Sequence, residues 1–126
     1  MIVWNWPFAV ASAFAVAAFL FHVIVGGRRS LSPMLAEDGL PRHARMTLWY
    51  VWHLISAGLL ATALVFLGAA LRPEWIVIAW AVGLLLAVFS VIALAQTVLM
   101  RLPVGMVPHW ILFAPAAALA IWGAMR

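Results

Sequence analysis

The chain has 126 residues, of which 69% are hydrophobic and only 8% are charged. A soluble domain of this size carries about a quarter charged residues, so the composition excludes a water-soluble globular domain and predicts one membrane-embedded domain over residues 1–126. The net charge is +4, but the arginines lie beside hydrophobic stretches and form no dense basic face, which argues against nucleic-acid binding. The absence of cysteine excludes disulfides, thiolate metal sites and iron–sulfur clusters.

Four apolar stretches are long enough to cross a bilayer as helices, which takes about 20 residues each. In chain order they cover residues 3–25, 46–71, 75–100 and 107–124. The sequence therefore predicts an all-α transmembrane four-helix bundle with short loops. The last stretch is the shortest and contains Pro115, which predicts a kink or a locally thinned bilayer at that helix.

The connections contain residues typical of helix ends. Gly26 and Gly27 follow the first stretch, and glycine tolerates the positive φ that commonly ends a helix. Ser32 and Pro33 then resemble an N-cap and the first position of a short helix. Residues 72–74 form an Arg-Pro-Glu sequence, which predicts a tight turn between the second and third stretches.

The arginines predict an orientation in the membrane. Positive residues concentrate in cytoplasmic loops. Five arginines lie on one side of the predicted bundle and two on the other: Arg28, Arg29, Arg42, Arg45 and Arg101 against Arg72 and Arg126. The larger group is expected in the cytoplasm, which places both termini on the outer, periplasmic side.

Three of the four histidines are expected at one membrane level, namely His22, His53 and His109. Residues three, four and seven apart share a helix face, and small residues mark the faces along which membrane helices pack. The residues that share the face of each histidine are mostly small: Ala11, Ala15 and Ala18; Ser56, Ala57, Leu60 and Ala61; Phe113, Ala116, Ala117 and Ala120. The pattern predicts three imidazoles that point into the bundle and meet in one chamber near the cytoplasmic leaflet.

This histidine cluster indicates a ligand site, because an ionisable side chain inside a membrane segment is costly and is by default a functional candidate. Neutral imidazole binds zinc, copper, nickel and iron, and two imidazoles ligate haem b. His22, His53 and His109 are therefore candidate ligands of a metal ion or of haem, with Tyr50 as a further cofactor-binding residue. A redox cofactor at this level would permit electron exchange with a quinone.

A second hypothesis gives the histidines a structural role. A histidine near a membrane interface can bond to Tyr, Ser or a backbone carbonyl of a neighbouring helix. The chain would then be an accessory or scaffold subunit of a larger membrane complex, or a homo-oligomer, with its small-residue faces and eight tryptophans packing against partners. Whether the chain is an enzyme stays open, and it contains no phosphate-binding glycine loop and no H-E-x-x-H zinc motif.

Three short motifs are spread over the sequence: His22-x-x-x-Gly26-Gly27-Arg28, Trp52-His53 and Pro108-His109-Trp110. With these motifs the chain resembles a group of small, uncharacterised four-span bacterial inner-membrane proteins. The resemblance covers the whole chain and implies a location in the bacterial inner membrane. It implies no activity.

Overall fold

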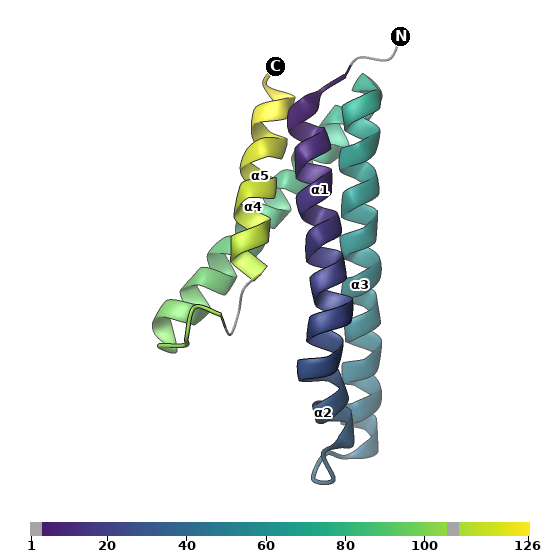
Figure 1. The fold of residues 1–126 in the computed structure, drawn as a ribbon, viewed down its shortest axis with the longest axis vertical. Helices are drawn as coiled ribbons and strands as arrows, with labels where there is room; N and C mark the ends of the chain where they lie inside the picture. Colours follow the sequence, from purple (N-terminus) through teal and green to yellow (C-terminus); the bar gives the residue numbers. More distant parts are fainter. Residues whose placement is uncertain (1–3, 106–108) are drawn as a thin grey trace.

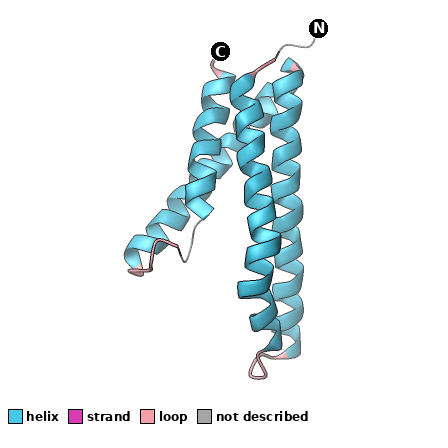
Figure 2. Cartoon of the chain, viewed as in Figure 1, coloured by secondary structure: helices cyan, strands magenta, loops and turns pink. Residues whose placement is uncertain are grey.

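The computed structural model describes residues 4–105 and 109–126, and within these ranges all regular structure is helical (Figures 1 and 2). The elements are α1 (Trp6–Leu20), the π-helical segment η1 (Phe21–Leu31), α2 (Ser32–Ala36), α3 (Arg42–Leu71), the 3₁₀ turn η2 (Pro73–Trp75), α4 (Ile76–Leu99) and α5 (His109–Ala124). The predicted all-α class and the helical bundle are confirmed.

Three helical segments are long and apolar enough to cross a membrane. They are Trp6–Ala36, Arg42–Leu71 and Pro73–Leu99, with 31, 30 and 27 residues. Helix α5 has only 16 residues, which at 1.5 Å per residue is about 24 Å, shorter than a hydrocarbon core of about 30 Å. The chain thus has three candidate spans and a shorter fourth apolar helix, and residues 107 and 108 of the predicted fourth stretch lie outside the described residues.

The first helix does not end at its two glycines, so the predicted stop at Gly26 and Gly27 is wrong. No described glycine has a positive φ, and α1, η1 and α2 follow one another without a break. The backbone N–H of Ser32 donates to the carbonyl of Gly27, the i→i+5 pattern that widens a helix instead of ending it. Gly26 is needed here for contact: a Cβ on it would lie 2.9 Å from the Trp52 ring of α3.

The turns after α3 and α4 have different structures. The predicted tight turn at residues 72–74 is confirmed by η2, which has Pro73 in its first turn. Helix α4 ends in a Schellman motif, because Leu102 N–H donates to the Thr97 carbonyl at 2.9 Å and Arg101 N–H to the Val98 carbonyl at 3.2 Å. Arg101 occupies the left-handed position with φ of 51°, a conformation that costs a side-chain-bearing residue about 1–2 kcal/mol.

Helix α1 is central to the packing, since it contacts both α3 and α5, whereas α4 packs mainly on α5 (Figure 1). Small residues permit these contacts. A Cβ on Gly83 of α4 would lie 2.8 Å from the Cβ of Ala120 on α5. The Ser12 hydroxyl of α1 donates to the Ala63 carbonyl of α3 at 2.8 Å. Close approach of backbones through small residues is typical of membrane helix packing.

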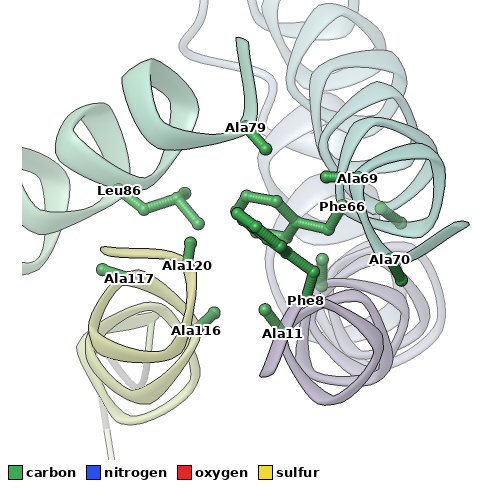
Figure 3. Close-up of a cluster of buried hydrophobic side chains, with 12 residues drawn as sticks. Phe8, Ala11, Phe66, Ala69, Ala70, Ala79, Leu86, Ala116, Ala117 and Ala120 are labelled. Atoms are coloured by element: carbon green, nitrogen blue, oxygen red, sulfur yellow. The ribbon is translucent and has the colours of Figure 1, made fainter. Parts of the chain in front are cut away.

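The hydrophobic core lies in the half of the bundle nearer the termini. Phe8 and Phe66 are fully buried with ring centroids 6.2 Å apart, and alanines of α1, α3, α4 and α5 surround them (Figure 3). The start of α1 and the C-terminus lie at this end (Figure 1), where the Trp6 and Trp122 rings meet edge to face at 4.9 Å. In the other half, α4 leans away from α1 and α3, and this divergence is where the candidate site lies.

Candidate functional site

A cavity of about 750 Å³ lies between two pairs of helices that diverge: the first helix with α3, and α4 with α5. Its walls come from η1, α3, α4, the loop before α5 and the start of α5, and most of the lining side chains are aliphatic or aromatic. Sites for small molecules have this size and character, with a few polar groups that orient the ligand. The cavity is therefore large enough for an organic ligand and much larger than a metal ion requires.

The polar side chains of the cavity are concentrated toward the end away from the termini. Element η1 contributes His22, Arg29 and Ser30, and α5 contributes its first residue, His109. Thr62 of α3 is nearer the core, among aliphatic residues. The cavity thus has a polar end and an apolar interior, which matches a ligand that is itself polar at one end.

His22 is fixed by two contacts with Trp52 of α3. Its side chain is only 5% exposed, its ring stacks on the indole with centroids 4.0 Å apart and planes 18° apart, and its Nε2 lies 3.3 Å from the Trp52 carbonyl oxygen. A carbonyl oxygen only accepts, so the bond requires the proton on Nε2. In the neutral ring, Nδ1 then keeps its lone pair and can accept a hydrogen bond or bind a metal.

Trp52 positions His22, a role that the sequence did not reveal. Its carbonyl also accepts a hydrogen bond from the Ser56 hydroxyl at 2.9 Å, and its ring lies over Gly26. In the sequence, Trp52 stands out only as part of the short Trp52-His53 motif. The missed signal is the pairing of a tryptophan on one helix with a glycine on its antiparallel neighbour.

Replacing Gly26 with alanine is expected to displace the Trp52 ring and to break its stack with His22. The added Cβ would approach two ring carbons at 2.9 and 3.1 Å, and overpacking of this kind costs about 1–3 kcal/mol. Gly27→Ala is the matched control, because nothing lies within 4 Å of its Cβ position and alanine is favoured over glycine in a helix by about 1 kcal/mol. Thermal unfolding in detergent should show G26A less stable than wild type and G27A at least as stable; equal losses would contradict the contact.

The other predicted site residues lie in two different places. His109 lines the same cavity as His22. His53 does not line it; its side chain is exposed, with its ring 4.3 Å from that of Trp49. Tyr50 is 62% exposed and is also outside the cavity lining. The structure thus brings two of the three predicted imidazoles to one cavity and leaves His53 and Tyr50 on the outer surface of α3.

The predicted inward direction of His53 is wrong because the inner face of α3 lies elsewhere around the helix. Leu59, Ala63, Phe66 and Ala70 are buried on that face, whereas Ala57, Leu60 and Ala61, which share the face of His53, are exposed. The stripes behind the other two histidines are buried as predicted: Ala11, Ala15 and Ala18, and Ala116, Ala117 and Ala120. Small residues therefore marked the packed face on α1 and α5, whereas on α3 they lie on both the packed face and the exposed face.

Metal binding by three histidines finds no support in the part of the chain that the structure describes. Within residues 4–105 and 109–126, no three His, Asp or Glu side chains are grouped so that they could hold a metal ion. All four histidines lie within these ranges. Two imidazoles on one cavity are still the number that ligates haem, but the Nε2 of His22 is used in its bond to Trp52.

No family model, no curated protein and no solved structure matches this chain. The three short motifs therefore do not place it in a known family. It is a small helical protein with three long apolar helices and a shorter fourth. What it can bind depends on the geometry and chemistry of the cavity.

Proposed function

We propose that this chain is a multi-pass protein of the bacterial inner membrane that binds a small amphipathic molecule in the cavity, with His22 and His109 contacting the polar group. The single observation that carries the proposal is that both histidines, from helices far apart in sequence, line one cavity of about 750 Å³ with an otherwise mainly apolar wall. His22 is buried, and an ionisable side chain buried inside a membrane protein is costly, so a ligand that contacts this imidazole would offset that cost.

The proposed topology has four crossings, with α5 as a short fourth span and both termini on the periplasmic side. The excess of arginine at the opposite end supports this orientation. The polar end of the cavity would then lie near the cytoplasmic leaflet. Molecules dissolved in the bilayer would reach the cavity where α4 diverges from α1 and α3.

Haem and quinone are more specific forms of the same proposal. Haem would need His22 to coordinate through Nδ1, or to release the Trp52 carbonyl. A quinone has carbonyl oxygens that only accept, so it would need hydrogen-bond donors, which His109 and Ser30 provide, whereas the Nε2–H of His22 is used in its bond to Trp52. Haem would give a Soret band that shifts on reduction, and a quinone would be recognised by its mass after extraction.

The test is to purify the protein from its native membrane and measure retained small molecules by native mass spectrometry, with absorption spectra and metal analysis. We expect a molecule bound one to one in the wild type. His22→Ala and His109→Ala should each lower the affinity for this molecule about five- to tenfold, because that factor corresponds to a lost hydrogen bond of about 1–1.5 kcal/mol.

His53→Ala is the matched control, because it removes the same side chain outside the cavity. Occupancy in this variant should equal that of the wild type. A protein that retains no small molecule, or an equal loss in all three variants, would refute the cavity as the binding site.

The contacts of His22 favour a second candidate function. Its bond to the Trp52 carbonyl and its stack on the indole ring are what a purely structural histidine would make between two membrane helices. The chain would then act as an accessory or scaffold subunit, or as a homo-oligomer. In that case the His22→Ala variant would lose stability, and the wild type would co-purify with another subunit instead of a small molecule.

A further inference from the structure

We infer that the occupant of the cavity is an anionic phospholipid of the surrounding bilayer, with its phosphate at Arg29 and Ser30 and one acyl chain in the apolar interior. The inference rests on the proposed function, because it names the ligand of the same cavity. It is carried by the charge of the cavity lining and by the order of polar and apolar residues along it.

The cavity lining has a permanent positive charge and no negative one. Arg29 is among the lining residues, and its guanidinium stays protonated at any physiological pH. The chain has three acidic residues, Glu37, Asp38 and Glu74, and none of them lines the cavity. An anionic group is the complement of such a site, and the planar guanidinium suits the two oxygens of a phosphate.

The lining changes from polar to apolar in the order in which a phospholipid changes. Arg29 and Ser30 are exposed and lie about two helical turns beyond His22 on the first helix. Leu59 and Leu86 are buried and line the opposite, interior part of the cavity. A headgroup would therefore remain at the surface of the protein. The acyl chain would lie between α3 and α4, which contact each other little, and would make apolar contacts with both helices.

The surroundings of the polar end support the same ligand. Arg28, Arg42 and Arg45 lie at this end of the first helix and of α3. Basic clusters beside membrane spans attract the anionic lipids of the cytoplasmic leaflet, and basic pockets between spans bind their headgroups. The cavity with Arg29 is such a pocket, and the other arginines would raise the local concentration of anionic lipid.

The test places the full-length protein in nanodiscs that contain equal amounts of phosphatidylcholine and phosphatidylglycerol, and identifies retained lipids by native mass spectrometry. We expect one phosphatidylglycerol per chain, preferred over phosphatidylcholine. Arg29→Gln should lower the preference about tenfold. Arg28→Gln removes the same charge from the neighbouring residue, which does not line the cavity, and should leave the preference within about twofold of the wild type.

A cavity-filling variant separates this inference from the proposed function. Gly58 lines the cavity, and nothing lies within 4 Å of its Cβ position, so Gly58→Leu should place a side chain in the apolar interior and lower retention of every ligand that binds there. The lipid inference is wrong, and the cavity remains a binding site, if G58L lowers retention but R29Q retains phosphatidylglycerol like the wild type. The same conclusion follows if R28Q loses as much as R29Q. If G58L retains ligands like the wild type, the proposed function fails as well.

Discussion

Replacing Gly83 with leucine is expected to destabilise the folded protein by about 2–3 kcal/mol, because the new side chain would force α4 away from α5. Even the Cβ alone would lie 2.8 Å from the Cβ of Ala120. Ala120 is fully buried, so neither backbone can shift without disturbing the core. Thermal or denaturant unfolding in detergent micelles, followed by circular dichroism, measures the loss.

Gly27→Leu is the control for this substitution, because it makes the same chemical change inside a helical segment, outside the cavity lining and with nothing within 4 Å of the new Cβ. Its stability should match the wild type or exceed it, since leucine has a higher helix propensity than glycine. If Gly83→Leu is as stable as Gly27→Leu, then α4 and α5 do not pack through this glycine. A graded loss from Gly83→Ala to Gly83→Leu would support the close contact further.

The helices were predictable because length and hydropathy are local properties of the sequence. The second and third apolar stretches match α3 and the segment Pro73–Leu99 closely at their ends near the turn at residues 72–74. The predicted end of the first helix failed for a non-local reason. Gly26 lies against the Trp52 ring of α3. Glycine often ends a helix, but here it lies inside one and permits close packing on the neighbouring helix.

The candidate site was predictable only in part, because a side chain's direction depends on which helix face meets a neighbour. On α1, the buried alanines Ala11, Ala15 and Ala18 correctly indicated the direction of His22. On α3, small residues occur on more than one face, and the buried face contains Phe66, which fills space that alanine cannot. The expectation for His53 therefore failed, although the rule that led to it was the same.

The cavity itself could not be predicted from periodicity. It exists because α4 packs on α5 and meets α3 mainly near η2. The pair α4 and α5 therefore diverges from the first helix and α3 toward the polar end of the cavity. The apolar pattern of a single helix does not indicate how far that helix diverges from its neighbours. Arg29 was predicted only as an orientation signal, and its place in the cavity lining follows from the π-helical continuation of the first helix, which the sequence did not indicate.

Replacing Phe66 with alanine is expected to cost about 2 kcal/mol of stability. Phe66 is 0% exposed and packs against Phe8 in the centre of the core (Figure 3). In soluble proteins such a change costs about 3–5 kcal/mol. In a bilayer the separated helices would keep the ring in lipid, so the transfer contribution is small and the lost packing contacts remain. Unfolding in micelles or bicelles, compared with the wild type, measures this value.

Leu64, two residues earlier on α3, provides the control, because its side chain is 57% exposed on the surface of the chain. If this surface faces lipid, Leu64→Ala should change stability by less than about 0.5 kcal/mol, since alanine and leucine are both solvated by acyl chains. Leu64→Asp should instead impair membrane insertion by about 3 kcal/mol, whereas on a water-facing surface it would be harmless. Normal insertion and stability of the aspartate variant would therefore contradict the membrane-spanning role of α3. Equal losses of stability for Phe66→Ala and Leu64→Ala would contradict the assignment of Phe66 to the core.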